Sequence, residues 1–165
     1  MSQEKLFRID INSHDTFMEA CDALHDATCD DSDIIYDPKK GTLDILFDRQ
    51  DFGNYTDAIT ARSRWFFYIQ VGFPFARSRL HLTGLKYFKK IADYPNLKNV
   101  EFNECNHSNG TYYLGFHYSL SIELSFESEI LGHLEDSELI DEKRWFLLAR
   151  KGSERAKRYK GLASG

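Results

Sequence analysis

The sequence has little proline, little cysteine and no long apolar run. Three prolines in 165 residues leave few positions where a strand or helix must end. No apolar stretch approaches the roughly 18 residues that a membrane-spanning helix requires, and the first residues lack the apolar segment of a secretory signal. We therefore expect a cytoplasmic protein that does not enter a membrane.

The three cysteines, Cys21, Cys29 and Cys105, are an odd number and lack the paired spacing of a structural zinc site. Free thiols are typical of a reducing compartment, which agrees with a cytoplasmic location. Cys21 falls on the apolar side of a predicted helix, where a small thiol packs as a core side chain. We expect neither a metal nor a cofactor.

Motifs that mark common enzyme families are also missing. The chain has no phosphate-binding Walker loop, no glycine fingerprint for dinucleotides, no Cys-x-x-Cys pair, no His-Glu-x-x-His helix and no Gly-x-Ser-x-Gly turn. Catalysis also occurs on scaffolds without such motifs, so their absence only lowers the probability of an enzyme. We assign no catalytic residue.

Aromatic residues are abundant, at 15% of the chain, and charge is distributed unevenly. Residues 1–61 carry a formal charge of −9 and residues 143–160 carry +7, whereas the whole chain carries −5. The length predicts one domain over residues 1–160 with a hydrophobic core, followed by a frayed tail at residues 161–165.

An alternating segment is the clearest structural signal. Every even-numbered residue from Tyr112 to Phe126 is apolar, and most of the odd-numbered residues between them are polar. Because successive side chains of a strand point to opposite faces, this pattern predicts an antiparallel sheet with one buried and one solvated face. A two-residue hairpin loop inside the segment would break the pattern, so we expect one long strand, or a bend at Gly115 that keeps the faces.

Asn109-Gly110, just before this segment, is a strong hairpin signal. A three-residue loop over 108–110 sets Phe102 opposite Phe116, with both on the buried face, whereas a two-residue loop sets Phe102 opposite His117. We therefore predict the longer loop.

The remaining pattern predicts an α+β fold. A predominantly antiparallel sheet of about six to eight strands, curled or arranged as a sandwich or barrel, is covered by an N-terminal and a C-terminal helix. The other expected elements are a helix over His14–Thr28 capped by Ser13, strands at Ile34–Tyr36, Thr42–Phe47 and Arg64–Val71, a turn near Pro74, a short helix or loop at Tyr87–Tyr94, an irregular or briefly helical connection after Phe126, and a helix over Asp141–Tyr159.

Five residues near the hairpin are candidates for a ligand or partner site. Tyr113, His117 and Glu123 belong to the predicted solvated face, and this row describes either a bare sheet face or a binding face. Cys105 and His107 share a strand face, where they can form a zinc site or an activated thiol if Glu101 or His117 converges on them.

A cluster of basic residues near the C-terminus is the strongest electrostatic feature. Such a cluster can cover the acidic first third of the chain, bind an acidic protein or neutralise the phosphates of a nucleic acid. Its members are Arg150, Lys151, Arg155, Lys157, Arg158 and Lys160.

The acidic body and the solvated sheet face favour a non-catalytic protein-interaction module, such as an accessory subunit or an inhibitor- or immunity-type protein. An alternative is a small-molecule-binding protein or enzyme whose aromatic-walled pocket uses His117 or His107. A third interpretation is nucleic-acid binding through the basic cluster. The identity of a partner and the oligomeric state do not follow from the sequence.

Overall fold

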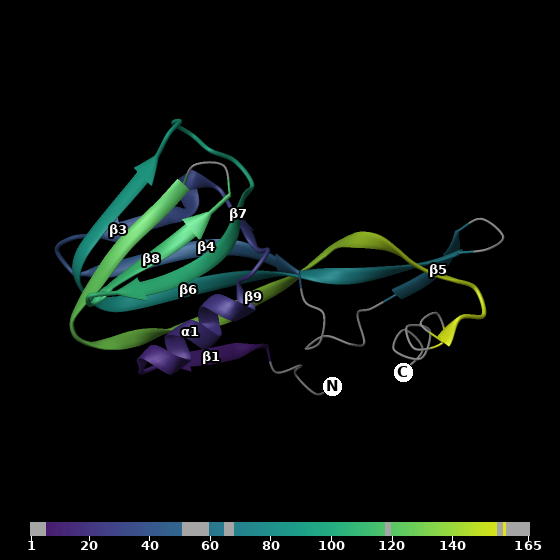
Figure 1. The fold of residues 1–165 in the computed structure, drawn as a ribbon, viewed down its shortest axis with the longest axis horizontal. Coiled ribbons are helices and arrows are strands. Elements are labelled where there is room, and N and C mark those ends of the chain that lie inside the picture. Colours follow the sequence, from purple (N-terminus) through teal and green to yellow (C-terminus); the bar gives the residue numbers. More distant parts are fainter. Residues whose placement is uncertain (1–5, 51–59, 65–67, 118–119, 155–156, 158–165) are drawn as a thin grey trace. The chain divides into compact units, whose positions relative to one another are not determined.

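The computed structural model describes residues 6–50, 60–64, 68–117, 120–154 and 157. In this part of the chain one antiparallel sheet of nine strands is accompanied by a single α-helix (Figure 1). The elements are β1 (Arg8–Ile11), α1 (His14–Ala23), β2 (Thr28–Cys29), the 3-10 turn η1 (Asp31–Asp33), β3 (Ile34–Asp37), β4 (Thr42–Gln50), β5 (Thr60–Arg64), β6 (Tyr68–Ala92), β7 (Val100–Ser108), β8 (Thr111–Phe116) and β9 (Leu120–Arg150).

The sheet closes on itself. Its strands follow the order β1-β9-β8-β7-β2-β4-β6-β5, and β6 pairs a second time with β9. Six strands, β9, β8, β7, β2, β4 and β6, therefore form a closed antiparallel barrel. β1 is added beside β9, β3 beside β4 and β5 beside β6.

The predicted α+β class is wrong, although the predicted antiparallel sheet and N-terminal helix are confirmed. The described part of the molecule is mostly β, and no C-terminal helix runs through residues 141–150, because these residues continue strand β9. The apolar run Trp145–Leu148 fits neither a helical nor a strand period, so pairing with a neighbouring strand decides its conformation.

Contacts divide the chain into two compact units. The first contains residues 1–49 and 77–138, and the second contains residues 50–76 and 139–165. Because β6 and β9 pass from one unit into the other, each of these two strands contributes to both cores.

The core of the first unit is filled by inward-facing side chains of the strands and by one face of α1. Phe17 and Ala20 of this face, together with Leu24 just after the helix, are buried in one cluster with the strand residues Leu43 and Phe102. Such dense side-chain packing leaves the interior of a narrow barrel filled rather than hollow.

Helix α1 begins where the sequence predicts. Ser13 Oγ accepts a hydrogen bond from the backbone N–H of Thr16 at 3.2 Å, and the Thr16 hydroxyl accepts one from the N–H of Ser13 at 3.1 Å. The helix ends at Ala23 instead of Thr28, because Asp26 adopts a positive φ of 66° and then bonds Phe102 of β7.

The alternating segment is two strands and not one. β8 ends at Phe116 and β9 begins at Leu120, and these two residues are directly paired. Three residues separate them, so even-numbered residues pair with even-numbered residues along the hairpin, as in Tyr112 with Leu124. A three-residue connection preserves the faces as well as a continuous strand does, and the prediction of one long strand overlooked it.

The β7–β8 hairpin reaches the predicted register by a different route. Phe102 does pair with Phe116, but Ser108 pairs with Thr111, which leaves a two-residue turn. Asn109 and Gly110 have φ values of 51° and 76°, as a type I′ turn requires. A β-bulge between Phe102 and Glu104 supplies the extra residue that restores the register.

The second unit is built from β5 and the adjoining parts of β6 and β9. Ile69, Val71 and Phe73 are buried. The Arg62 guanidinium lies 3.8 Å from the Trp145 ring centroid, and a Cβ added at Gly72 would lie 3.1 Å from the same ring. Trp145 is therefore a packing residue, as predicted, but it acts from a strand.

Strand β6 also passes through Pro74 and Tyr87, where the sequence predicts a turn and a short helix or loop. Similarly, the connection expected after Phe126 is the middle of β9. The fixed φ of proline is compatible with extended backbone, and proline removes only one hydrogen bond of the ladder. No helix in the described residues is long and apolar enough to cross a membrane.

Candidate functional site

The outer surface of three neighbouring strands brings together Tyr87 of β6, Tyr113 of β8 and Glu123 of β9. Tyr113 and Glu123 are direct partners across the β8–β9 ladder. The Tyr87 hydroxyl donates a hydrogen bond to Glu123 Oε2 at 3.3 Å. The two tyrosines are 42% and 41% exposed, so each presents a large part of its ring to solvent. We call these three residues the tyrosine face.

Small side chains lie next to the tyrosine face. Gly115 pairs with Ser121 one step along the β8–β9 ladder from the Tyr113–Glu123 pair on the same side of the sheet. A Cβ added at Gly115 would lie 3.2 Å from Glu104 Cγ. Beside the tyrosine face, therefore, the side chain of Glu104 covers the position of Gly115.

The charge on the tyrosine face is not neutralised by a neighbouring cation. Among the described residues, no lysine or arginine forms an ion pair with Glu123. Partial removal from water, followed by the negative charge of Glu123, raises the pKa of Tyr87 above 10, so its hydroxyl remains a donor. The face therefore carries one negative charge beside two phenol groups.

His117, the third residue predicted for the solvated face, has a different set of contacts. Its Nε2 lies 3.5 Å from Glu101 Oε1, and its backbone N–H donates to the Glu101 carbonyl at 2.8 Å. The structure therefore joins Tyr113 and Glu123, as a common binding face requires, and places His117 with β7.

Of the four residues proposed to converge, Glu101 and His117 meet, but Cys105 and His107 have other neighbours. Cys105 lies partly buried beside Cys21, and a thiol–thiol hydrogen bond together with burial raises the pKa of Cys21. His107 is exposed and stacks on Tyr112 at a centroid distance of 4.3 Å. No group of three or more potential metal ligands occurs among the described residues.

His107 instead lines a cavity of about 500 Å³, where inward-facing side chains of β7, β8 and β9 meet the start of α1. His14 lies on its other side, with Nδ1 2.7 Å from the Tyr112 hydroxyl. We call this cavity the histidine pocket. Its lining residues are Asn12, Ser13, His14, His107, Gly110, Tyr112, Phe126, Ser128, Glu129, Ile130 and Leu131.

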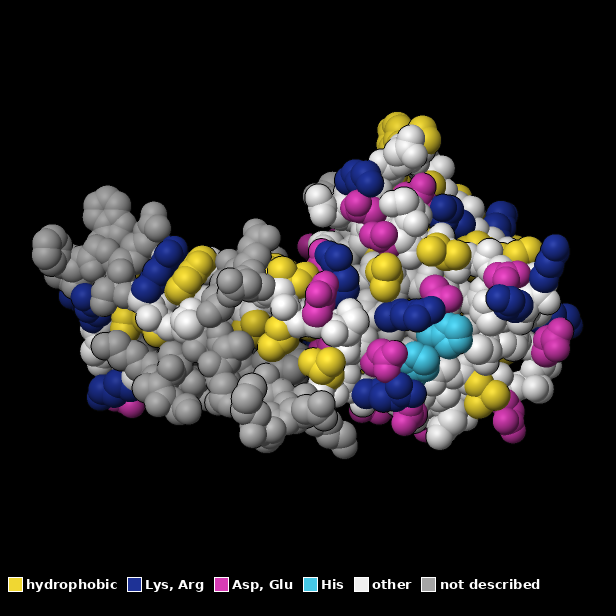
Figure 2. All heavy atoms as spheres, turned by 180° about the vertical axis from the view of Figure 1, so that it is seen from behind, with side chains coloured by type: hydrophobic (Ala, Val, Ile, Leu, Met, Phe, Trp, Pro, Cys, Tyr) yellow, Lys and Arg dark blue, Asp and Glu magenta, His cyan; other side chains and the backbone are white. Residues whose placement is uncertain are grey.

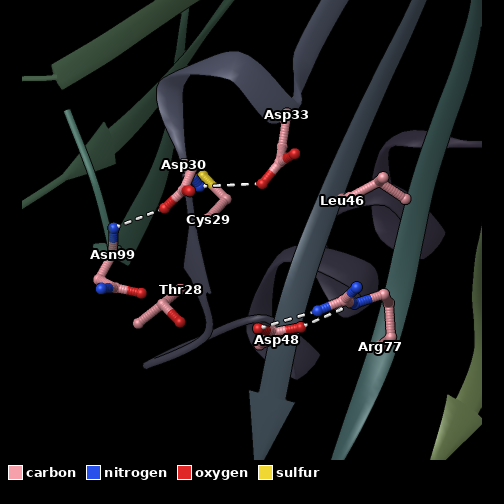
Figure 3. Close-up of a pocket in the computed structure, with 8 residues that line it drawn as sticks. All are labelled: Thr28, Cys29, Asp30, Asp33, Leu46, Asp48, Arg77 and Asn99. Atoms are coloured by element: carbon pink, nitrogen blue, oxygen red, sulfur yellow. Dashed lines mark hydrogen bonds and ion pairs between the residues drawn. The ribbon is translucent and has the colours of Figure 1, made fainter. Parts of the chain in front are cut away.

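A second cavity, of about 290 Å³, is acidic (Figure 3). Asp30 accepts from the Asn99 N–H at 2.9 Å and from Lys98 Nζ at 2.9 Å, and these bonds lower its pKa. Asp33 accepts from the backbone N–H of Asp30, while Asp48 pairs with Arg77. The carboxylates of this pocket therefore act as internal hydrogen-bond and ion-pair partners.

Ion pairs cross a different outer surface, on which Figure 2 shows neighbouring histidines among side chains of both charges. The rings of His81 and His133 lie 5.3 Å apart. Asp44 accepts from both Arg79 and His81, at 2.7 and 2.8 Å. Glu135 lies 3.3 Å from His133 and 2.6 Å from Arg8. Because these charges are matched internally, the surface has little net charge to attract a partner.

The predicted basic cluster is only partly visible. Arg150 and Lys151 are exposed, and Lys157 Nζ contacts Glu154 at 2.7 Å. Its other members, Arg155, Arg158 and Lys160, lie outside the described residues. Whether this cluster covers the acidic first third of the chain or contacts a nucleic acid stays a prediction.

No protein-family model, curated protein or solved structure matches this chain. The candidate surfaces therefore depend on geometry alone. Sequence reasoning missed Tyr87 and His14. Tyr87 was assigned to a short helix or loop, because Tyr87–Ile91 shows no regular alternation of apolar and polar residues. His14 has no sequence signal, because its contact with Tyr112 joins residues far apart in the chain.

Proposed function

We propose that this chain is a non-catalytic protein-interaction module that binds its partner through the tyrosine face. The observation that carries this proposal is the pair of half-exposed rings of Tyr87 and Tyr113 on either side of the Glu123 carboxylate. Three adjacent strands hold these groups, so little conformational entropy is lost when a partner contacts them.

Tyrosine is common at the centres of protein interfaces, since one side chain supplies a large apolar ring and a hydrogen-bonding hydroxyl. The neighbouring pair on the same side of the β8–β9 ladder, Gly115 and Ser121, has small side chains, although the Glu104 side chain lies against Gly115. These features fit a contact surface better than an enclosed site for catalysis.

The charge of the face defines the partner's chemistry. Glu123 has no cationic partner among the described residues, and the chain as a whole carries −5. An arginine guanidinium can pair with a carboxylate and stack on a tyrosine ring at the same time. The partner is therefore a protein that inserts an arginine, or less favourably a lysine, between Tyr87 and Tyr113.

Affinity capture from the host with a panel of variants tests this proposal. The test variants are Tyr113→Ala and Glu123→Arg, and the matched control is Tyr94→Ala, which removes a tyrosine that is 65% exposed and is not one of the three residues of the face. We expect a protein that is retained by the wild type and by Tyr94→Ala but is lost with both test variants. The loss from Tyr113→Ala should exceed about ten-fold, as for interface hot spots.

Capture that does not depend on the face would overturn the proposal. One such outcome is a partner that all variants retain equally. Another is a partner that the control Tyr94→Ala loses as much as the two test variants do. Thermal unfolding of each variant must first show a native transition, so that loss of capture is not loss of folding. If the partner uses arginine, then replacing that arginine by lysine should weaken binding less than replacing it by alanine.

A further inference from the structure

The histidine pocket has a floor of aromatic rings. Tyr112, only 5% exposed, meets Phe17 edge-on at 4.9 Å and Phe126 edge-on at 5.9 Å. His107 stacks on Tyr112 with the ring planes 29° apart. These contacts fix Tyr112 and His107 in place, so the aromatic surface is formed before any ligand arrives.

Polar groups surround this aromatic floor. His14 Nδ1 and the Tyr112 hydroxyl lie 2.7 Å apart, and the rings of His14 and His107 are 5.2 Å apart with a tilt of 50°. The Asn12 amide and the hydroxyls of Ser13 and Ser128 belong to residues that line the same cavity. An aromatic wall with a few hydrogen-bonding groups is the usual composition of a small-molecule site.

The charge of the lining restricts the ligand further. No lysine or arginine occurs among the described lining residues, whereas Glu129 does. A phosphate or carboxylate would therefore find no permanent cation in the pocket. A flat, uncharged ring can stack against the imidazoles and hydrogen-bond through its edge.

We propose that the histidine pocket binds a small, uncharged, planar heteroaromatic molecule, of the class of a free nucleobase or a pyridine carboxamide. The ring of the ligand stacks against His107 and His14, and its polar edge meets the hydroxyl and amide groups of the rim. This site is separate from the tyrosine face, because the two share no residue.

Three probe compounds of similar size test this proposal. Nicotinamide is planar and uncharged, nicotinate is planar and anionic, and cyclohexanecarboxamide is uncharged but not planar. Each is titrated into the full-length protein at pH 8 while backbone amide shifts are recorded by NMR. We expect nicotinamide to cause saturable shifts around His14 and His107. Cyclohexanecarboxamide should bind at least about five-fold more weakly, as loss of one stacking contact implies. Nicotinate should also bind more weakly, because its carboxylate meets no lysine or arginine among the described lining residues.

Two histidine variants then locate the binding site. His107→Ala removes the stacking ring, so nicotinamide should bind about five-fold or more weakly. His117→Ala is the matched control, because it removes an exposed histidine that follows β8 and is not among the lining residues of the pocket. Tyr113→Ala should leave nicotinamide binding unchanged, which separates this site from the tyrosine face.

The proposal is overturned if nicotinamide gives no saturable shift at these residues. Equal binding of all three probes, or equal binding by His107→Ala and the wild type, would also overturn it. Each variant should retain the dispersed amide spectrum of the native fold, so that a lost response reports on the pocket.

Discussion

At the scale of single residues, the most constrained group is a buried polar cluster of Arg49, Ser78 and Asp136. Arg49 Nη2 donates to Asp136 Oδ2 at 2.7 Å and Arg49 Nε to Ser78 Oγ at 3.2 Å, while the Ser78 hydroxyl donates to Asp136 Oδ1 at 2.5 Å. The ring of Phe7 covers the guanidinium at 4.5 Å. Each member of the cluster is less than 5% exposed, so its charges depend on one another.

Removing the negative charge from this cluster should destabilise the protein strongly. Asp136→Asn removes the carboxylate that the buried Arg49 guanidinium contacts at 2.7 Å, and we expect the free energy of unfolding to fall by about 3–5 kcal/mol. Urea denaturation measures this loss, with the exposed Glu138→Gln as control. A loss no greater than that of the control would show that water reaches Arg49.

Among the strands and loops, local sequence signals were a good guide to which residues face the core. They were a poorer guide to where each strand ends. The alternation over Tyr112–Phe126 correctly assigned Leu114, Ile122 and Leu124 to the interior. It could not show the hairpin after Phe116, because a three-residue connection leaves the alternation intact.

The β7–β8 hairpin gives a similar lesson. Facing apolar residues predicted the pairing of Phe102 with Phe116, and Asn109-Gly110 marked the turn. The bulge after Phe102 has no sequence signal of its own. Without it, the pairing of Phe102 with Phe116 requires a three-residue loop, so the sequence predicted the correct pairing with the wrong loop length. Strands β6 and β9 were divided into shorter pieces for a related reason, since long-range pairing carries them through Pro74 and through acidic segments.

The barrel closes at a position that requires glycine. A Cβ added at Gly132 of β9 would collide with the backbone carbonyl oxygen of His81 in β6. Because backbone cannot yield as a flexible side chain does, we expect Gly132→Ala to lower the free energy of unfolding by about 1–3 kcal/mol.

Gly115→Ala is the control for that substitution. The nearest atom to its added Cβ is Glu104 Cγ of a flexible side chain, at 3.2 Å, so a smaller loss should result. The two variants are compared by thermal and urea unfolding. If both lose the same stability, the close approach of β6 and β9 at His81 does not limit barrel closure.

For the molecule as a whole, stability should depend on pH through His133. Burial lowers the pKa of His133 from 6.5, and the positive charges of Arg8, His81 and Arg79 act in the same direction against Glu135. The unfolded chain therefore takes up this proton at a higher pH than the folded protein does. Stability should fall as the pH drops below about 6.5 and level off once the folded form is also protonated.

Urea denaturation between pH 8 and pH 5 measures this dependence. His133→Asn cannot take up the proton, so its stability should change less over the same range than that of the wild type. His25→Asn, at a histidine more than half exposed, serves as the control and should retain the wild-type slope. Parallel curves for the wild type and His133→Asn would contradict the prediction.

The whole molecule presents surfaces of different character. The surface around His81 and His133 is neutralised by internal ion pairs, whereas the tyrosine face has two exposed rings and a carboxylate without a cationic partner among the described residues. Sequence reasoning placed Tyr113 and Glu123 on a solvated face, but the third member, Tyr87, became visible only when β6 was seen to reach β9. The pairing of β6 with β9, which cannot be read from a single sequence, brings Tyr87 to the site.

The most direct test of the account is a spectroscopic footprint of the partner on the tyrosine face. The protein is labelled with 3-fluorotyrosine, and the fluorine signals of Tyr87, Tyr113 and Tyr94 are assigned with single Tyr→Phe variants. When the captured partner is added, the signals of Tyr87 and Tyr113 should shift or broaden together, while that of the control Tyr94 stays in place. Binding that moves Tyr94 and leaves Tyr87 and Tyr113 unchanged would contradict the central claim.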